Sequence, residues 1–437
     1  MSVRKFFRGI YFSNEPLTEK DYGISRNFSI AEGASARTIL TLTSGAFLAG
    51  FASYLGSGDS FNGIIGAIPV LVGIVQLVSP IIFEKMEKRK WLVVLLNLMH
   101  RLLLGFMVFI PFIAKGQTAR LALVAVIYLI SYMAVSFASP ASAGWLIDLT
   151  PDSIRGRYLS IRESYAFGAA TVLALITGRV LDIFKDGGNE YGGFIVMFGF
   201  IFVLALGNFI MMSMMKEPPV KRSKSELSLK KIITIPLKDL RFRKVVILFI
   251  FWNIGLQIAA PFFAVYMVTG LKLNYTYIMA VGMLGNLTNT LLVRLWGKMA
   301  DRKSWLFVIN LSILILAFTH FSWFFVNKST ALVLVPLLHI TGGIAWAGIG
   351  ISTFNIQFIY SPEEGRTVYI GFNAALGGLV GFLSTLAGSL LVLVFEYYKV
   401  SFYGFTIGNM QIIFALSGIL LAVCAAYIYK FIPKADD

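Results

Sequence analysis

The chain has 437 residues, of which 57% are apolar and 14% are charged, and its mean hydropathy is +0.77. Because soluble domains average about 25% charged residues, these values exclude a soluble globular enzyme, a disordered chain and a fibrous protein. One membrane-spanning helix uses roughly 20 apolar residues, so the apolar residues suffice for about twelve crossings. A membrane enzyme, a channel and a transporter are all compatible with this composition.

Apolar segments separated by short polar gaps predict twelve transmembrane helices and an all-α integral membrane fold. They span residues 31–56, 60–83, 91–113, 120–147, 158–184, 194–215, 245–270, 275–297, 305–327, 330–359, 367–395 and 410–432. The one long gap contains ten Lys or Arg residues and divides the helices six plus six. The predicted domains are a cytoplasmic N-terminal segment 1–28, a six-helix bundle 29–215, a basic linker 216–244 and a six-helix bundle 245–437 with a short tail.

The net charge of +16 is concentrated on one side of the predicted topology. Lys and Arg are numerous before the first apolar segment and in the even-numbered gaps, and they are sparse in the odd-numbered gaps. The positive-inside rule therefore predicts that both termini and the linker are cytoplasmic, in a protein of the cytoplasmic (inner) membrane. The linker is expected either to contact anionic membrane lipids or to be a solvated tether. Nucleic acid is not needed to explain the charge.

Two loops of the first half have counterparts in the second half. Acidic and basic residues precede Trp91 after the second segment and Trp305 after the eighth. A Pro, an acid, an Arg and a Tyr recur in 151–158 and in 362–369. Two matching loops at nearly half the chain length indicate a duplication, so we expect two pseudo-symmetric bundles related by an axis along the membrane normal.

The residues Gly297-Lys-Met-Ala-Asp301-Arg302 fit the G-x-x-x-D-R/K loop motif of the major facilitator superfamily, which this chain resembles over nearly its whole length after residue 30. The resemblance implies a bacterial twelve-helix secondary transporter that works by alternating access. The copy of the motif after the second segment departs from the pattern, with Phe83 for Gly and Glu87 for Asp. The fourth segment also lacks an internal Arg, and the fifth lacks a Gly-Pro pair, which argues against a typical drug/proton antiporter.

Charged residues of the cytoplasmic loops are candidates for a gate. We expect Asp301, next to Arg302, to bridge to the Arg155/Arg157 end of the fifth segment, because a carboxylate gains about 0.3–1 kcal/mol near a helix N-terminus. By pseudo-symmetry, Glu87 is expected to face Arg366. The superfamily resemblance implies that such contacts close the cytoplasmic side in the outward-open state. The alternative is that these charges only set the topology.

Ionisable residues inside apolar segments are costly and therefore point to function. The deepest are His100 and Arg101 in the third segment, followed by Arg162 and Glu163 in the fifth. Glu163 is a candidate proton-coupling carboxylate, since a desolvated Glu can titrate near neutral pH, or else it forms a gate salt bridge with a neighbouring Arg. For Arg101 the alternatives are anion binding, pairing with Glu163 and a structural ion pair.

Polar and aromatic side chains fall on single faces of several segments. The topology implied by the resemblance places helices 1, 4, 7 and 10 around a central cavity. The expected substrate-binding residues are therefore Tyr132, Gln257, His339 and Trp346, together with Asn286 on helix 8. Amides with aromatic rings suit hydroxyl-rich or amphipathic solutes. The alternative for each of these residues is a hydrogen bond between helices, worth about 0.6 kcal/mol.

The sequence thus predicts a secondary active transporter for a small organic solute, coupled to an ion that we expect to be the proton. We expect it to act as a monomer without cofactor or metal, and not as an enzyme, because the three histidines are dispersed and no Asp-x-x-Asp cluster is present. Alternatives are a drug or amphipath efflux pump, a lipid flippase and a transporter-like sensor. The sequence is compatible with a sugar, an organic anion or a mixed set of hydrophobic drugs as the substrate.

Overall fold

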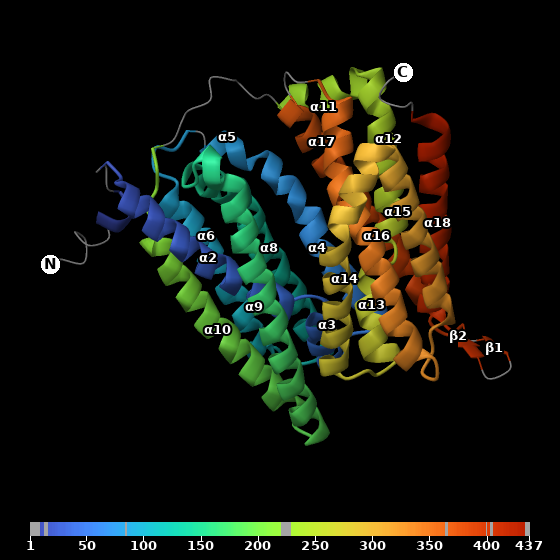
Figure 1. Ribbon diagram of the computed structural model, residues 1–437. Coiled ribbons are helices and arrows are strands. Elements are labelled where there is room, and N and C mark those ends of the chain that lie inside the picture. Colours follow the sequence, from blue (N-terminus) through green and yellow to red (C-terminus); the bar gives the residue numbers. More distant parts are fainter. Residues whose placement is uncertain are drawn as a thin grey trace. The chain divides into compact units, whose positions relative to one another are not determined.

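The computed structural model describes residues 9–12, 16–83, 85–219, 229–362, 366–398, 400–402 and 405–432. Nearly all of this part of the chain is helical (Figure 1). The chain forms two compact units. The first unit combines Met1–Ser57 with Val75–Glu226, and the second combines Gly58–Ile74 with Leu227–Asp437. Parts of the predicted linker and of both termini lie outside the described residues.

The first unit is built from helices of very different lengths. They are α2 (Glu19–Leu42), α3 (Gly45–Tyr54), α5 (Ser79–Phe83), α6 (Lys90–Phe106), η2 (Met107–Phe109), α7 (Ile110–Ile113), α8 (Gln117–Asp148), α9 (Asp152–Asp186) and α10 (Glu190–Met214). The helix α2 packs against α9 and α10, and α6 packs against α8 and α10. This packing brings the middle of α2 against the two helices that carry Arg162 and Asn208.

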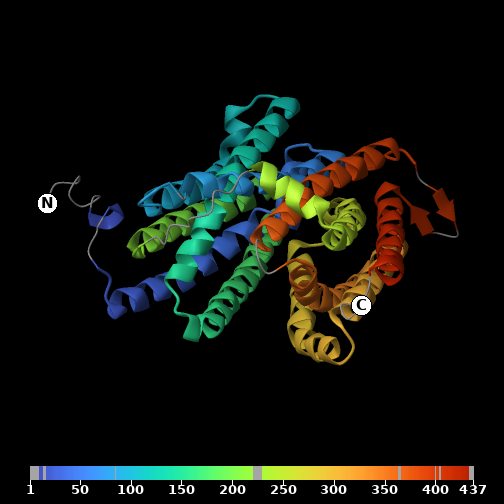
Figure 2. The ribbon, with the colours of Figure 1, turned by 90° about the horizontal axis from the view of Figure 1, so that it is seen from above.

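The second unit consists of helices and one small hairpin. They are α4 (Asp59–Val72), α11 (Leu229–Lys238), α12 (Leu240–Gln257), α13 (Ala260–Val265), the π-helical turn η3 (Tyr266–Gly270), α14 (Tyr275–Arg302), α15 (Trp305–Ser322), η4 (Trp323–Phe325), α16 (Ala331–Tyr360), α17 (Arg366–Val394), the antiparallel strands β1 (Val400–Phe402) and β2 (Phe405–Ile407), and α18 (Asn409–Phe431). The helix α12 packs against α17 and α18, and α15 packs against α16 and α18. Figure 2 looks down on these helices and shows the red α18 beside the yellow-green α12.

Within the described residues, eleven helical stretches are long and apolar enough to span a membrane. They correspond to the predicted segments from the second to the twelfth, so the all-α, multi-pass membrane fold is confirmed. The first predicted segment, 31–56, is not among them, and the count of twelve is not confirmed. Its residues are divided between α2 and α3.

The break between α2 and α3 has a local cause. The hydroxyls of Thr38, Thr41, Thr43 and Ser44 each donate to the backbone carbonyl four residues earlier, a contact that weakens and bends a helix. Gly45 then has a φ of +54°, which a residue with a side chain rarely adopts. The chain leaves the α2 axis at this point and restarts as α3.

Residues 58–74, which the sequence places in the first bundle, group with the second unit. The helix α4 packs against α13 and α17. Ser60 donates to the carbonyl of Ser389, and a Cβ added at Gly63 would lie 2.4 Å from the ring of Phe262. The glycine therefore lets α4 approach closely. The division into two six-helix bundles stays a prediction.

Candidate functional site

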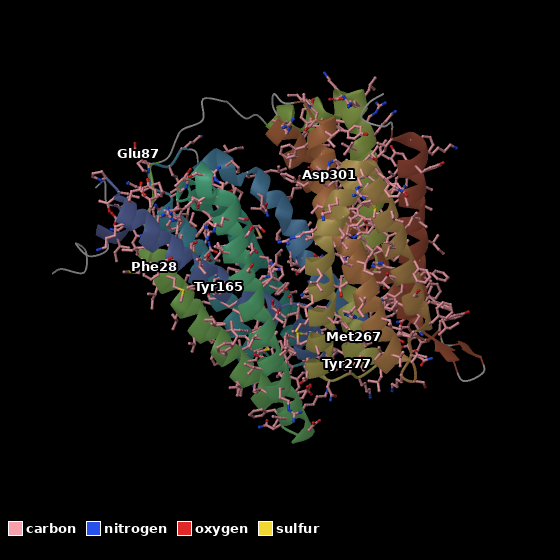
Figure 3. The ribbon with its side chains drawn as sticks, in the orientation of Figure 1. Phe28, Glu87, Tyr165, Met267, Tyr277 and Asp301 are labelled. Carbon is pink, nitrogen blue, oxygen red and sulfur yellow. The ribbon has the colours of Figure 1, made fainter. Side chains whose placement is uncertain are left out.

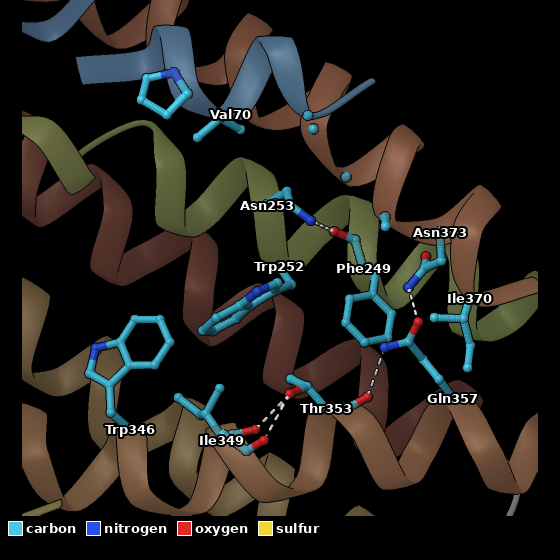
Figure 4. Close-up of a pocket in the computed structure, with 16 residues that line it drawn as sticks. Val70, Phe249, Trp252, Asn253, Trp346, Ile349, Thr353, Gln357, Ile370 and Asn373 are labelled. Atoms are coloured by element: carbon cyan, nitrogen blue, oxygen red, sulfur yellow. Dashed lines mark hydrogen bonds between the residues drawn. The ribbon is translucent and has the colours of Figure 1, made fainter. Parts of the chain in front are cut away.

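A pocket of about 510 Å³ opens within the second unit, among the membrane-spanning helices (Figure 4). It lies between α4, α12, α16 and α17, and Pro69 and Val70 of α4 contribute apolar atoms. The side chains that give it chemical character are Phe249, Trp252, Asn253, Trp346, Gln357 and Asn373. A volume of this size with a few polar groups in a mainly apolar wall is typical of sites for small molecules.

A chain of hydrogen bonds links two helices on the polar side of the pocket (Figure 4). Gln357 Nε2 donates to the carbonyl of Thr353 at 3.0 Å, and Gln357 Oε1 accepts from Asn373 Nδ2 at 3.0 Å. Asn373 is only 4% exposed, yet its Oδ1 has no hydrogen-bond partner in the described part of the chain. A buried acceptor without a partner is unfavourable by about 1–3 kcal/mol, so a ligand that donates to this oxygen would relieve that cost.

Two tryptophans form the aromatic part of the wall. The rings of Trp252 and Trp346 meet edge to face, with centroids 5.8 Å apart. Trp252 is 8% exposed, whereas Trp346 is 40% exposed. The buried ring thus holds the accessible one in place, and Trp346 offers its surface to a bound molecule. None of the described residues that line the pocket has an ionisable side chain.

The residues predicted to bind substrate have different positions in the structure. Of these, Trp346 lines the pocket. Gln257 is half-buried at the end of α12, where its carbonyl accepts from Thr385. His339 is half-buried, with Nδ1 2.8 Å from the carbonyl of Val335, and Asn286 is exposed on α14. These three residues do not line this pocket, and their roles stay predictions.

Tyr132 lies in the first unit, where it is buried in a hydroxyl and aromatic cluster. Its hydroxyl oxygen lies 3.3 Å from that of Tyr128, and its ring meets His100 edge to face with centroids 5.1 Å apart. Tyr128 in turn donates to the carbonyl of Thr43, at the break between α2 and α3. His100 Nδ1 is 2.7 Å from the hydroxyl of Ser131. His100 and Tyr132 therefore take part in packing contacts between helices.

A charged site of the first unit centres on Glu32 of α2. Arg101 Nη2 lies 3.2 Å from Glu32 Oε1, and Arg162 Nη2 lies 2.8 Å from Glu32 Oε2. Asn208 donates to the carbonyl of Glu32 and to the hydroxyl of Ser35. The side chains of Glu32 and Arg101 are 12% and 6% exposed. One carboxylate thus joins α2, α6 and α9 and compensates two buried guanidinium groups.

Among the described residues, Arg101 forms its ion pair with Glu32 and not with Glu163, the partner that the sequence suggested as one alternative. Glu163 pairs with its neighbour Arg162 at 3.0 Å, and its side chain is 50% exposed. Successive residues of a helix point about 100° apart, so α9 can turn Arg162 toward α2 only by turning Glu163 away. Of the alternatives for Arg101, the structure shows a buried ion pair.

The sequence-based reasoning missed Glu32 as a site residue because it stands near the polar start of the first apolar segment. A usable signal was present, since Ser29, Glu32, Gly33 and Ser35 put small and polar side chains at helical spacing on one face. A Cβ added at Gly33 would lie 2.8 Å from the guanidinium carbon of Arg162. Because Gly33 has no side chain, the guanidinium group of Arg162 can pack directly against α2 at this position.

The predicted gate residues lie at the ends of helices in their own units. Glu87 is exposed before α6, and Asp301 and Arg302 are exposed at the opposite end of α14 from Tyr277 (Figure 3). Arg155 donates to the carbonyl of Thr150. The guanidinium of Arg366 lies 4.6 Å from the ring centroid of Phe358. Both predicted gate pairs join one unit to the other, so they stay predictions.

A second charged cluster lies beside Glu87, at the start of α6. Arg89 Nη2 is 3.1 Å from Asp148 Oδ2, and the backbone N–H of Arg89 donates to Glu217 at 2.7 Å. Lys90 is 2% exposed, and its Nζ donates to the carbonyls of Ile10 and Ser213. These contacts join the residues before α2, the end of α8 and the end of α10 to the start of α6.

Comparison with protein families identifies the fold that carries these sites. A family model described as Major Facilitator Superfamily matches residues 33–385. The chain belongs to the major facilitator superfamily. The resemblance found in the sequence is therefore confirmed, and the chain is a multi-pass membrane protein with a transporter fold. No curated protein sequence matches it.

Solved structures of three transporters of this superfamily type have a similar fold. The nucleoside transporter NupG is 13% identical, with a TM-score of 0.63, covering 94% of this chain and 99% of its own. A D-xylose-proton symporter is 12% identical, with a TM-score of 0.65 and coverages of 95% and 98%. A POT family transporter, solved with a thioalcohol-conjugated peptide, is 12% identical, with a TM-score of 0.67 and coverages of 96% and 97%. At these identities the likeness shows the fold alone.

Proposed function

We propose that this protein is a secondary active transporter that moves a small organic solute across the cytoplasmic membrane by alternating access. The pocket among α4, α12, α16 and α17 is the observation that supports the proposal most strongly. It combines a solute-sized volume, two tryptophan rings and a buried acceptor without a partner at the level of membrane-spanning helices. Binding energy from such groups can stabilise one conformation of a transporter over another.

The proposed orientation places both termini and the basic linker in the cytoplasm, because Lys and Arg concentrate there. Labelling of introduced cysteines tests this orientation. A cysteine introduced at Lys272, between η3 and α14, should react with an impermeant maleimide from outside intact cells. One introduced at exposed Lys85 should react only after lysis. The native Cys424 is fully buried, so it gives little background. The reverse pattern would contradict this orientation.

We further propose that transport is coupled to the proton and that Glu163 is the coupling carboxylate. The Glu163 side chain is 50% exposed in a membrane-spanning helix and forms an ion pair with Arg162, so a change in the charge of this carboxylate would break the pair. One structural neighbour is named as a proton symporter. Glu163→Gln should then leave solute binding intact and abolish the dependence of uptake on a pH gradient.

Uptake into liposomes that contain the purified protein tests transport itself. Vesicles with and without an imposed pH gradient should differ in the rate and final level of solute uptake. A solute flux that no ion gradient changes would refute coupled transport. Flux of a lipid or of amphipathic drugs alone would instead favour the flippase or efflux alternatives.

The gate proposal rests on the charge pattern of the loops, in which Asp301 pairs with Arg155 and Glu87 with Arg366. Asp301→Arg and Arg155→Asp should each impair uptake, and the double exchange should partly restore it. Asp186→Arg, at the other end of α9, serves as a control for a change of charge alone. If the double exchange restores no uptake, the proposed pairing of Asp301 with Arg155 is contradicted.

A further inference from the structure

We propose that the pocket of the second unit selects an uncharged ring-shaped solute that carries O–H or N–H donors, and that Asn373 determines this specificity. The inference rests on the proposed transport function and names its substrate class. It chooses among the sugar, organic anion and hydrophobic drug alternatives that the sequence leaves open. Three independent features of the pocket carry it: the polarity of its hydrogen-bond chain, its lack of charge and its aromatic wall.

The polarity of the hydrogen-bond chain is fixed by a backbone group. The carbonyl of Thr353 can only accept, so the Gln357 atom that faces it at 3.0 Å must be the amide nitrogen. The Gln357 oxygen therefore faces Asn373. Because this oxygen can only accept, the Asn373 atom that lies 3.0 Å from it must be the amide nitrogen. The remaining atom of Asn373 is therefore the acceptor Oδ1, which has no partner among the described residues. A ligand must bring a donor to this atom.

Charge is excluded by what lines the pocket. None of the described lining residues is Asp, Glu, Lys, Arg or His, and the wall is mainly apolar. Moving a charged group into such a site without a counter-charge is strongly unfavourable. Arg101, the residue that made an organic anion plausible from the sequence, is already paired with Glu32 in the first unit. A carboxylate or phosphate would therefore find no cation among the groups that line the pocket.

The aromatic wall and the volume favour a ring. Trp346 is 40% exposed and is held by the edge-to-face contact with Trp252, so it offers a flat surface of fixed orientation. Flat apolar faces flanked by hydrogen-bonding edges occur in pyranosides and nucleosides. A volume of about 510 Å³ has room for either. A purely hydrophobic drug cannot donate to Asn373 Oδ1 and so gains no binding energy from this acceptor.

The test uses pairs of probes that share one ring system and differ in a charged group, with binding to the purified full-length protein measured by thermal shift and tryptophan fluorescence. Methyl glucoside is compared with methyl glucuronide and with the methyl glycoside of glucosamine, and adenosine is compared with adenosine monophosphate. At least one neutral probe is expected to bind at least about tenfold more tightly than its charged partners. Tighter binding of a charged partner, or binding of no neutral probe, would overturn the inference.

Substitutions of Asn373 test whether this residue determines which probe binds. Asn373→Ala should weaken the neutral probe that binds best by about 5- to 100-fold, because the acceptor is lost. Asn373→Asp keeps an acceptor and adds a negative charge, so it should shift preference toward the glucosamine glycoside. The control is Asn355→Ala, because Asn355 donates to the carbonyl of Ile351 in its own helix and is not among the described residues that line the pocket. An equal loss in Asn355→Ala, or no change of preference in Asn373→Asp, would contradict the role of Asn373.

The same probes separate this inference from the proposed function. If a neutral probe binds through Asn373 but does not cross the liposome membrane, the specificity holds and transport fails. If the vesicles accumulate an organic anion and the rate is the same in Asn373→Ala, transport holds and the specificity is wrong.

Discussion

Arg162 of α9 and Glu32 of α2 lie 130 positions apart in the sequence, and their side chains form an ion pair of 2.8 Å. The same carboxylate also receives Arg101. The side chains of Arg101 and Arg162, which are 6% and 17% exposed, therefore share this acid, and Arg162 has a second ion pair with Glu163. Loss of Glu32 would remove the ion pair of Arg101 and one of the two ion pairs of Arg162.

The first prediction concerns Glu32→Gln. Removing one partner of a buried ion pair destabilises a protein by about 3–5 kcal/mol, since the other charge stays buried. Thermal unfolding in detergent, followed by tryptophan emission, should show a clear fall in Tm. Glu163→Gln is the matched control, because its half-exposed pair contributes about 0–1 kcal/mol. Replacing Glu32 and Arg101 together by Leu should recover part of the loss, and failure to recover would contradict the pairing.

The second prediction concerns the contact between α14 and α16. A Cβ added at Gly343 would lie 2.4 Å from the backbone oxygen of Gly285, so Gly343→Ala must push the two helices apart. Overpacking of this kind is destabilising by about 1–3 kcal/mol. Gly282→Ala, in the same helix as Gly285 and with open space around it, should leave Tm unchanged or slightly raised. Equal effects of the two substitutions would show that the helices are not this close.

The third prediction concerns Lys90, whose buried ammonium group holds the carbonyl of Ile10 at 2.8 Å and lies 5.2 Å from the ring of Tyr11. Lys90→Met keeps the length of the side chain and removes these donors. The segment around Ile10 should then detach, and chymotrypsin should cleave after Tyr11 several times faster, as measured by mass spectrometry.

Lys85→Met provides the control for Lys90, because Lys85 is exposed in the same loop. Its rate of cleavage after Tyr11 should equal that of the unchanged protein. An unchanged rate in Lys90→Met would mean that Lys90 does not hold this segment.

The fourth prediction concerns Trp346 and the neutral ring probe that binds best. An aromatic face contributes about 0.5–1.5 kcal/mol beyond its buried area, so Trp346→Ala should weaken binding about 3- to 10-fold. Trp346→Phe should retain most of the affinity. Isothermal titration measures this without relying on tryptophan emission. Equal losses in the two variants would argue against a role for the aromatic face.

The sequence by itself determined the class of fold. Runs of about 20 apolar residues can satisfy their backbone only as helices in lipid, and eleven of the predicted segments are spans in the described structure. The loop Gly297–Arg302 and the loop repeat were local patterns, and the family they indicated is confirmed. The first segment is not among these spans, and it breaks between α2 and α3 at hydroxyl contacts and at Gly45, with its φ of +54°.

Only the tertiary structure decided which polar residues meet. Periodicity placed Trp346 on a polar and aromatic helix face, but whether that face shares a pocket with Gln357 and Asn373 depends on how α16 and α17 pack. Likewise, the sequence showed Arg101 as a buried charge, and the packing of α2 against α9 and α10 supplied Glu32 as its partner. Pairing of charges depends on distances of a few ångströms between helices that are remote in sequence, and helical spacing within one segment contains no information about them.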